Sequence, residues 1–404
     1  MEQCTIEGFG PVPVVRPGSI AELGDLVRAA DQNEQAIYPL GGRTMLDLGR
    51  IPTKAGTGID LRGLDQVIDY PARDMTITVQ AGITMARLQE ILSDEHQRLP
   101  VDVPRAGQAT LGGTIATNTS GPRRLGAGTL RDYVIGISAV NDDGNEFKAG
   151  GRVVKNVAGY DLCKLLTGAL GTLGIVTQVT LKVRPRPEEQ ALVLLGADTG
   201  ALQAILEKLH ASRVRPMCLD LVSAKAAAAL GGGVQLPEHP WLVLVGFEDS
   251  RQAVQWQIEQ LQHEFTDLDV KVMREPGLWS ALVEFAQREE AKVSFKANML
   301  PAGVAAFCRD AAQAGWLLQA HAGSGIVRGQ LDMSISREEG KRLLAALRQA
   351  AQARQGNVII TRCPLEWKPH LPVWGEVRSD LALMKQVRER FAPKNLFNPG
   401  RFVV

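Results

Sequence analysis

Residues 111–121 read Leu-Gly-Gly-Thr-Ile-Ala-Thr-Asn-Thr-Ser-Gly, a run of small residues with almost no bulky side chain. A backbone of this kind can lie flat against a planar ligand and offer its N–H groups to that ligand. The run therefore predicts a binding surface made by the main chain, provided that other segments contribute to the same surface.

A second glycine turn precedes this run along the chain. Residues 39–44 read Pro-Leu-Gly-Gly-Arg-Thr and include the end of an expected strand. Because Gly41 and Gly42 have no Cβ, they can adopt positive φ and direct successive N–H groups toward one point, which suits a pyrophosphate. Arg43 and Thr44 would add a positive charge and a hydroxyl donor. A plain tight turn is the alternative for a Gly-Gly pair that stands alone.

A third run has a glycine at every third position. It covers residues 168–176 and leads directly into an expected strand at 176–183. Such spacing indicates close approach of the backbone to a ligand, and tight packing between segments explains it equally well. No G-x-G-x-x-G opens a helix and no G-x-x-x-x-G-K-[ST] occurs, so neither a Rossmann fold nor a P-loop is expected. We predict instead that the three runs converge to seat a dinucleotide.

The bulk composition is that of an ordinary globular protein of 404 residues, with 45% hydrophobic and 22% charged residues. The 45 basic and 44 acidic residues leave a formal charge of +1, so nucleic acid is not an expected partner. No stretch is apolar over the roughly 18 residues that a membrane span needs, which predicts a cytoplasmic chain with at most peripheral membrane contact. Five widely separated cysteines without C-x-x-C spacing predict reduced thiols.

The order of elements changes at Pro185 and Pro187, because proline cannot continue a central strand and the glycine-rich character ends there. Before that point short strands alternate with helices, the first of them capped by Ser19. After it, strands and helices follow the α+β order of a ferredoxin-like half, and a comparable set recurs from residue 293. The expected domains are 1–187, 188–378, and a helix and turn at 379–404 that return to the ligand site.

Several motifs follow one another in the order seen in PCMH-type FAD-binding domains of the vanillyl-alcohol-oxidase fold, which this chain resembles. They are residues 39–44, residues 112–121, Val-Lys-Asn-Val-Ala-Gly-Tyr-Asp-Leu at 154–162, Gly-Thr-Leu-Gly-Ile-Val-Thr at 171–177, and a closing turn at 395–400. The resemblance covers about residues 14–187 well and the rest loosely. Within the family, the segments that begin at Gly121, Arg131 and Phe397 are similar to the FAD-binding subunits of glycolate oxidase.

The resemblance implies an α+β protein with a PCMH-type FAD-binding domain, a ferredoxin-like α+β cap domain, and FAD as the cofactor. By this resemblance the residues that contact FAD are Gly41, Gly42, Arg43, Thr44, Met45, Leu46, Ala109, Thr110, Leu111, Gly112, Gly113, Asn118, Gly121, Gly174, Ile175, Val176 and Asn398. Residues 41–46 would hold the pyrophosphate, residues 174–176 would lie near the adenosine half, and Asn398 would approach the ring system. Asp161 fits equally well as the cap of a short helix at 162–166.

Two departures from the family pattern matter. Covalent relatives use a histidine in the glycine loop or a cysteine farther on, whereas this loop offers Arg43 and Thr44, so we expect noncovalent FAD. Relatives that oxidise 2-hydroxy acids carry a His-x-Gly-Asp-Gly-Asn-x-His stretch and a Glu-His-Gly triplet, which resemble a metal site beside the flavin. This chain reads His-Ala-Gly-Ser-Gly-Ile-Val-Arg at 321–328 and lacks Glu-His-Gly, so no metal is expected.

The candidate residues of a substrate pocket are His321, Arg328 and Arg362, and the sequence assigns no catalytic residue. Arg328 could receive a carboxylate because its guanidinium fork matches that group. An arginine on a strand is, however, more often solvated or ion-paired. A histidine such as His321 is likewise more often satisfied within a fold than it is a base.

Intact cofactor motifs beside a broken metal motif favour an accessory FAD-binding subunit of a complex that oxidises glycolate. By the resemblance, its partners would be a catalytic FAD subunit and an iron–sulfur subunit. Two alternatives stay open. One is a self-sufficient FAD-dependent D-2-hydroxy-acid dehydrogenase, and the other is a flavin-free scaffold that docks partners through tryptophans such as Trp279 and Trp367.

Overall fold

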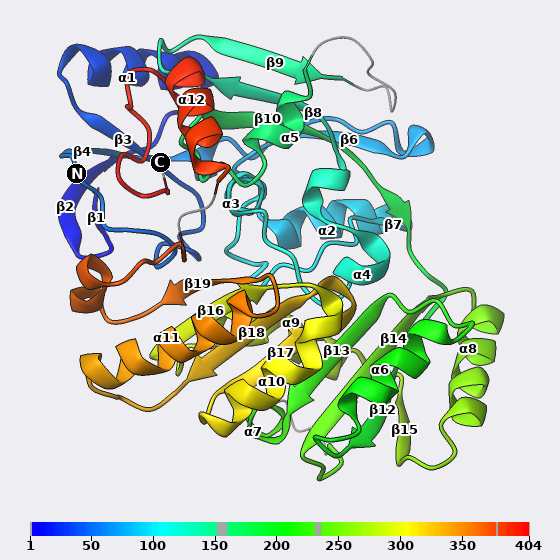
Figure 1. The fold of residues 1–404 in the computed structure, drawn as a ribbon. Coiled ribbons are helices and arrows are strands. Elements are labelled where there is room, and N and C mark those ends of the chain that lie inside the picture. The colour runs from blue at the N-terminus through cyan, green and yellow to red at the C-terminus, as the bar shows by residue number, and fades with distance from the viewer. Residues whose placement is uncertain (1, 152–159, 231–235, 377–378, 404) are drawn as a thin grey trace. The chain divides into compact units, whose positions relative to one another are not determined.

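The computed structural model describes residues 2–151, 160–230, 236–376 and 379–403 (Figure 1). By its internal contacts the chain divides into two compact units. The first unit comprises Met1–Thr119, Thr129–Arg186 and Glu376–Val404, and the second comprises Ser120–Gly128 and Pro187–Gly375. Residues 154–159 of the third family motif lie outside the described residues.

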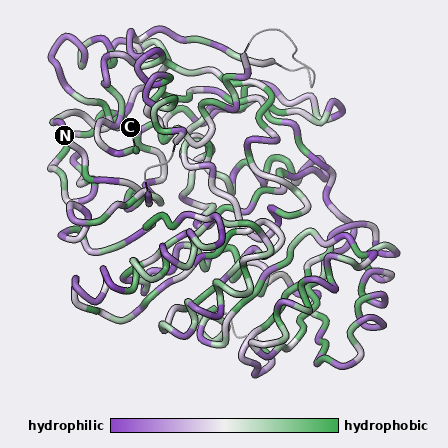
Figure 2. The backbone as a smooth tube through the Cα atoms, in the orientation of Figure 1, coloured by the Kyte–Doolittle hydropathy of each residue, from purple (hydrophilic) through white to green (hydrophobic). Residues whose placement is uncertain are grey.

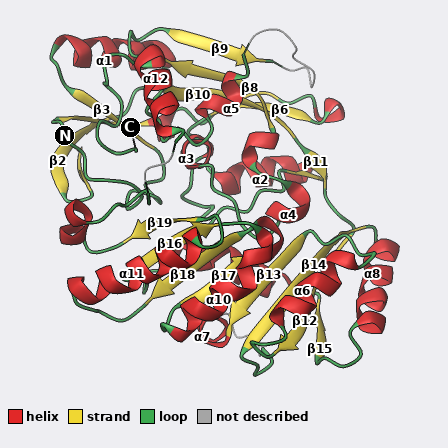
Figure 3. Ribbon diagram, in the orientation of Figure 1, coloured by secondary structure: helices red, strands yellow, loops and turns green. Residues whose placement is uncertain are grey.

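The first unit contains a four-stranded sheet of order β1-β2-β4-β3 and a five-stranded antiparallel sheet of order β5-β6-β10-β8-β9. Its strands are β1 (Glu2–Ile6), β2 (Phe9–Val15), β3 (Ala36–Leu40), β4 (Gly56–Asp60), β5 (Val67–Asp69), β6 (Thr76–Gln80), β7 (Gln97–Arg98), β8 (Val134–Val140), β9 (Glu146–Gly150), β10 (Ile175–Lys182) and β11 (Arg184–Pro185). Its helices are α1 (Ile20–Gln32), α2 (Met85–Asp94), α3 (Leu111–Thr117), α5 (Leu162–Leu166) and α12 (Leu381–Phe391). Figure 3 shows these elements by type.

Local sequence accounts for the helix starts in this unit. The Ser19 side chain accepts a hydrogen bond from the Glu22 N–H, so α1 begins where the cap was expected. The Asp161 side chain accepts from the Lys164 N–H and caps α5, which confirms the structural interpretation of that residue. Each cap satisfies a backbone donor that has no partner within its own helix.

The C-terminal turn returns to the first unit and extends its four-stranded sheet. Phe397 forms a parallel bridge with Ile37 of β3, and the Asn398 N–H donates to the Ile37 carbonyl at 2.9 Å. Leu396 and Phe397 are buried in the same hydrophobic cluster as the inner face of α1. Burial of these two side chains therefore anchors the turn and places Asn398 beside the end of β3.

The second unit is built on one antiparallel sheet of order β15-β12-β14-β13-β17-β18-β16-β19. Its strands are β12 (Glu189–Ala197), β13 (Cys218–Ser223), β14 (Trp241–Asp249), β15 (Val270–Met273), β16 (Val293–Asn298), β17 (Leu317–His321), β18 (Ile326–Leu331) and β19 (Asn357–Arg362). Its helices are α4 (Arg124–Ala127), α6 (Leu202–Ala211), α7 (Ala224–Ala229), α8 (Arg251–Glu264), α9 (Pro276–Glu284), α10 (Val304–Gln313) and α11 (Arg337–Gln352). The two expected ferredoxin-like halves join through the pairing of β13 with β17.

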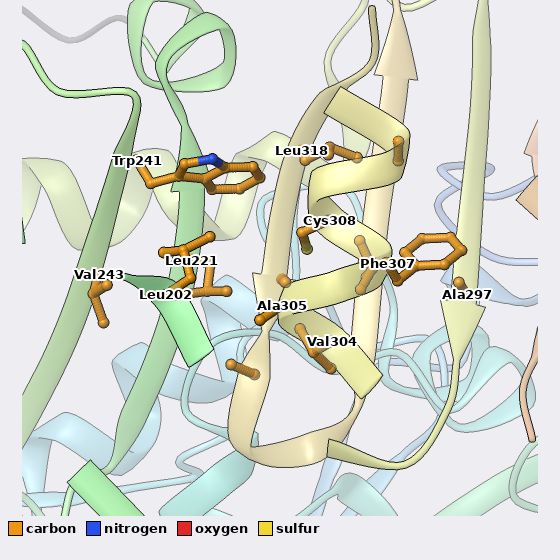
Figure 4. Packing of buried hydrophobic residues seen from close by; sticks show 14 of the residues in the cluster. Leu202, Leu221, Trp241, Val243, Ala297, Val304, Ala305, Phe307, Cys308 and Leu318 are labelled. Carbon is orange, nitrogen blue, oxygen red and sulfur yellow. The ribbon is translucent and has the colours of Figure 1, made fainter. Parts of the chain in front are cut away.

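The faces of this sheet differ because side chains alternate along a strand. On one face, Val243 and Val245 of β14 pack with the buried sides of α6, α8, α10 and α11 in one large cluster, part of which Figure 4 shows. On the other face, Leu242 and Leu244 pack with α7 and α9. Figure 2 shows the hydrophobic colouring of the strands and the more hydrophilic colouring of the outer helices. We call the side with α7 and α9 the α9 face.

Residues 120–128 depart from the expected domain division, because they pack with the second unit rather than the first. Arg123 forms an ion pair with Glu248 at 2.7 Å and lies over the Trp279 ring, 4.1 Å from its centroid. The Gly126 N–H donates to the Met217 carbonyl. These tertiary contacts attach residues 120–128 to the α9 face, although the segments on both sides of them in the sequence belong to the first unit.

Three further predictions concern the cysteines, two of the tryptophans and membrane-spanning helices. All five cysteines are free thiols. Trp279 and Trp367 are buried, so they belong to the core and do not form a docking face. None of the described helices is both long and apolar enough to cross a membrane.

Candidate functional site

The three small-residue runs converge on one cleft in the first unit, as predicted. The cleft and its open mouth together hold about 880 Å³, and a second hollow of about 540 Å³ shares Gly41, Thr110 and Asn398 with it. Volumes of this size suit a large organic cofactor. The predicted residues that line one or both hollows are Gly41, Gly42, Arg43, Thr44, Met45, Leu46, Ala109, Thr110, Gly112, Gly113, Gly174, Ile175, Val176 and Asn398.

The pair Gly41 and Gly42 is required where this turn meets residues 108–110. A Cβ on Gly41 would overlap the Thr110 hydroxyl, and a Cβ on Gly42 would overlap the Gln108 carbonyl. The next residue, Arg43, adopts the left-handed conformation with φ of 59°. Its guanidinium forms an ion pair with Glu2 at 2.8 Å. The loop is therefore held tightly against residues 108–110, with the Arg43 charge already matched by a carboxylate.

Helix α3 has one face of bulky residues that packs in the core and one face of small residues that lines the cleft. Leu111 and Ile115 are fully buried in the core beneath the helix, whereas Gly113, Ala116 and Thr117 line the cleft. The spacing of each set is that of one helical face. Leu111 therefore supports the cleft from below and does not line it.

The third run and the C-terminal turn complete the cleft. The Leu170 N–H donates to the Ala116 carbonyl at 2.8 Å, and the Asn398 side-chain Nδ2 donates to the Leu170 carbonyl at 2.7 Å. Leu170 and Gly171 both have positive φ, so the backbone turns sharply where it faces the cleft. Hydrogen bonds thus connect residues 111–121, residues 168–176 and Asn398 in a single chain of contacts.

Besides Leu111, two predicted cofactor residues do not line the cleft, namely Asn118 and Gly121. Asn118 ends α3 in the left-handed conformation, and its side-chain Oδ1 is buried without a hydrogen-bond partner among the described residues. A buried acceptor of this kind usually has a partner, and a bound cofactor would supply one. Gly121 belongs to the segment that packs with the second unit.

Sequence reasoning missed several residues that line the cleft. The added lining residues of the larger hollow are Ile6, Pro39, Leu40, Leu48, Val103, Pro104, Thr114, Ala116, Thr117, Thr119, Leu170 and Arg401. Arg401 donates to the carbonyls of Leu46 and Leu48, each at 2.7 Å, and so holds the loop that follows Arg43. Burial lowers the pKa of Arg401. Leu170 stood within the run at 168–176 and Arg401 directly follows the closing turn at 395–400, whereas Val103 and Pro104 carried no signal.

The candidate pocket residues lie on the sheet of the second unit, but not all of them together. His321 of β17 and Arg328 of β18 lie on neighbouring strands, where Gln319 pairs directly with Arg328. Arg362 of β19 donates to the carbonyls of Arg288 and Ala291, so its described contacts are with the backbone. The structure therefore groups His321 with Arg328 and places Arg362 at a separate backbone contact.

A row of polar side chains crosses the α9 face. We call it the polar row, and its members are Asp220, Gln319, His321, Arg328 and Lys296. Lys296 pairs with Arg328 in the register of β16 and β18, and sequence reasoning missed it. Its neighbours Phe295 and Ala297 are buried in the cluster on the opposite face, so a lysine in this alternating strand was the available signal.

The two cations of this row, Lys296 and Arg328, both have lowered pKa values, and the charge of Arg124 contributes to each shift. Burial, followed by the charges of Arg328 and Arg124, lowers the pKa of Lys296 to about 7. Burial also lowers the pKa of Arg328 to about 10, a shift that Asp220 opposes. Within the described residues, neither Lys296 nor Arg328 forms a salt bridge with a carboxylate, and the Arg328 Nε atom is buried without a partner. Such a cluster favours an anionic ligand.

Asp220 and His321 form a buried pair at one end of the polar row. His321 Nδ1 lies 2.8 Å from Asp220 Oδ1, and both side chains are almost fully buried. The other Asp220 oxygen accepts a hydrogen bond from Gln319 Nε2 at 2.8 Å. No group of three or more histidine, cysteine, aspartate or glutamate side chains suited to a metal ion occurs in the described part of the chain.

Comparison with known proteins agrees with the cleft. A family model described as an FAD binding domain matches residues 11–150. The chain is 30% identical over 249 residues to D-2-hydroxyglutarate dehydrogenase of Stutzerimonas stutzeri, covering 59% of this chain and 53% of that protein. It is 37% identical over 236 residues to glycolate oxidase subunit GlcE of Escherichia coli, covering 54% of this chain and 66% of that protein. The alignment with the first of these relatives therefore spans about half of that protein's length.

Two further likenesses cover almost the whole chain. D-lactate dehydrogenase of Archaeoglobus fulgidus is 25% identical over 421 residues, covering 96% of this chain and 91% of that protein. The structure of 4-ethylphenol oxidase from Gulosibacter chungangensis superimposes with a TM-score of 0.72 at 15% identity, covering 96% of this chain and 88% of that one. The FAD binding domain model and the cleft favour a chain that binds FAD over the flavin-free alternative. The chain thus carries a PCMH-type FAD-binding domain, has the fold of the vanillyl-alcohol-oxidase flavoproteins, and uses FAD as its cofactor.

Proposed function

We propose that this chain is an FAD-dependent oxidoreductase that acts on 2-hydroxy acids. The observation that carries the proposal is the polar row of the second unit, in which Lys296 and Arg328 lack a carboxylate partner among the described residues. A 2-hydroxy acid brings one carboxylate, which a guanidinium can bind through two parallel hydrogen bonds. When bound, FAD accepts two electrons from the substrate, and the residues of this chain bind and orient the acid.

The residues of the cleft fit FAD held without a covalent bond. Among the described residues that line the cleft, none is histidine or cysteine, the side chains expected for a covalent link to the flavin. We expect acid precipitation of the purified chain to leave its yellow colour in the supernatant. Colour that stays in the precipitate would contradict a noncovalent cofactor.

We propose further that the chain works as a subunit of a glycolate-oxidising complex, with a catalytic FAD subunit and an iron–sulfur subunit as partners. The similarity to a relative named glycolate oxidase subunit GlcE supports this assignment. Coexpression of the chain with its genomic neighbours should yield a stable assembly that oxidises glycolate in the presence of a dye. If no assembly forms and the other subunits are fully active without this chain, the subunit proposal fails.

The second candidate is a dehydrogenase that needs no other subunit. Two observations favour it: the polar row, which is suited to a substrate carboxylate, and the similarity over 96% of the chain to a relative named D-lactate dehydrogenase. Anaerobic mixing of the isolated chain with glycolate or D-lactate distinguishes the candidates. Bleaching of the flavin supports the second candidate, whereas bleaching only in the complex supports an accessory role.

A further inference from the structure

The C-terminal turn, residues 395–400, is fixed firmly to the body of the first unit. The Ile37 N–H of β3 donates to the Leu396 carbonyl at 2.9 Å, and the Asn398 N–H donates to the Ile37 carbonyl at 2.9 Å. Leu396 and Phe397 are 2% and 1% exposed. Both burial and hydrogen bonds therefore hold this turn in place, so it can serve as an anchor for other segments.

The loop at 43–53 forms one wall of the FAD cleft and lacks such an anchor of its own. It contains neither helix nor strand, and none of the side chains of residues 43–48 is fully buried. Segments with few buried side chains open at a lower free energy than the core does. The loop nevertheless supplies a large share of the cleft lining, through Arg43, Thr44, Met45, Leu46 and Leu48.

Arg401 joins this loop to the C-terminal turn. Its Nη2 donates to the carbonyls of Leu46 and Leu48, each at 2.7 Å, and its Nη1 donates to the Arg50 carbonyl at 2.8 Å. In return, the Arg50 N–H donates to the Arg401 carbonyl at 3.1 Å. Arg401 is 7% exposed, so water competes little for these bonds. Hydrogen bonds from a charged donor are also roughly twice as strong as those between neutral groups.

Thr53 and Gly400 bring the same two segments together at a second point. The Thr53 N–H donates to the Pro399 carbonyl at 3.3 Å. Gly400 has a φ of 82°, and a Cβ at this position would lie 2.5 Å from Thr53 Cγ2. The loop and the turn thus touch along several residues, and any movement of the loop away from the cleft breaks these contacts.

We infer that Arg401 is a positioning residue that sets how long the chain retains FAD. Its hydrogen bonds keep the loop at 43–53 closed on the cofactor, and FAD leaves when this loop separates from the C-terminal turn. The release rate of FAD then follows the strength of the contacts made by Arg401. The inference concerns the cofactor, so it does not depend on which acid the chain oxidises or on whether it works alone.

The test measures the exchange of bound radiolabelled FAD for excess unlabelled FAD in the holo chain, with no substrate present. Arg401→Met keeps much of the length of the side chain and removes its hydrogen-bond donors. FAD release should become roughly 10- to 100-fold faster, because hydrogen bonds from a charged group to three carbonyls are lost. Uptake of FAD by the apo form of this variant should not become slower, because the loop opens more readily.

A matched control lies in the same segment of the chain. Arg390 is an exposed residue of α12, and Arg390→Met should release FAD at the wild-type rate. Release from Arg401→Met at the wild-type rate overturns the inference. Slower uptake of FAD by Arg401→Met overturns it as well, because that result indicates direct binding of FAD by Arg401 or a general role in the fold.

A second measurement uses the wild-type holo chain and stays decisive if Arg401→Met does not fold. The Arg50 N–H, which is bonded to the Arg401 carbonyl, reports opening of the loop, and the Asn398 N–H, which is bonded to β3, reports opening of the turn. Hydrogen exchange followed by NMR, at a pH where exchange is limited by opening, should show Arg50 opening before Asn398 and at least as fast as FAD leaves. FAD release that is faster than the opening at Arg50 would overturn the inference, because the cofactor would then leave a closed loop.

Discussion

The cleft of the first unit and the polar row of the second are built in opposite ways. The cleft is formed mainly by backbone and small residues, such as Gly42 and Gly113, that come in continuous runs of sequence. The polar row takes single charged or polar side chains from β13, β16, β17 and β18. A backbone site depends on which side chains are absent, whereas a side-chain site depends on which charges are present. The two sites should therefore respond to different substitutions.

The largest effect is expected from adding one methyl group to the cleft. In Gly42→Ala the new Cβ would overlap the Gln108 carbonyl, and we expect FAD affinity to fall by roughly 10- to 100-fold. The ratio of flavin to protein absorbance measures the loss. Gly107→Ala is the control, because its Cβ would meet no atom within 4 Å. Normal FAD content in Gly42→Ala would contradict the tight approach of the two loops.

Next in size is the removal of a charge from the polar row. Arg328→Gln should weaken glycolate binding on the order of tenfold, because a charge-assisted hydrogen bond contributes about 1.5 kcal/mol or more. Calorimetric titration of the holo chain measures this change, and FAD content should stay normal. Lys292→Gln, which alters an exposed lysine just before β16, should bind glycolate as the wild type does. If Arg328→Gln binds glycolate with unchanged affinity, the glycolate carboxylate does not bind at this row.

The pH dependence of binding should be a smaller effect with a definite sign. Lys296 has a pKa lowered to about 7, so it is charged below that pH and becomes neutral above it. Glycolate affinity should therefore decrease by roughly threefold between pH 6 and pH 8, because Arg328 remains charged. Lys296→Met should abolish most of this dependence. An affinity that increases with pH would contradict the role of Lys296.

The smallest effect is expected at Asp161, which belongs to a family motif but caps α5. Asp161→Ala should lower the free energy of unfolding by about 1 kcal/mol through loss of the cap. FAD content and glycolate affinity should not change. Chemical denaturation measures the stability, and a drop in FAD content would show that Asp161 supports the cleft after all.

Local patterns predicted much of the fold. A strand ends at Leu40, within the stretch 39–44 where a strand end was expected, and α1 begins directly after Ser19 as expected. Most predicted cofactor residues line the cleft, because the glycine runs that revealed them are continuous in sequence. The prediction was less complete for Gly121, whose segment packs with the second unit through Arg123 and Gly126.

The polar row was harder to foresee, because its members come from separate strands. Of the candidate pocket residues, His321 and Arg328 lie on neighbouring strands, whereas Arg362 donates to backbone carbonyls. Lys296 was missed, since one lysine in a strand most often points to solvent. Its lowered pKa comes from burial and then from the charges of Arg328 and Arg124, which only the register and packing of the sheet bring near.

The amino-acid sequence by itself determined where the backbone can turn sharply and approach another segment, because the freedom of a residue without Cβ is a local property. The tertiary structure alone decided that His321 meets Asp220, a residue 101 positions away. It also decided that Lys296 lies beside Arg328. The charge and the hydrogen-bond partner of a buried side chain depend on the neighbours that surround it, and strand register selects those neighbours.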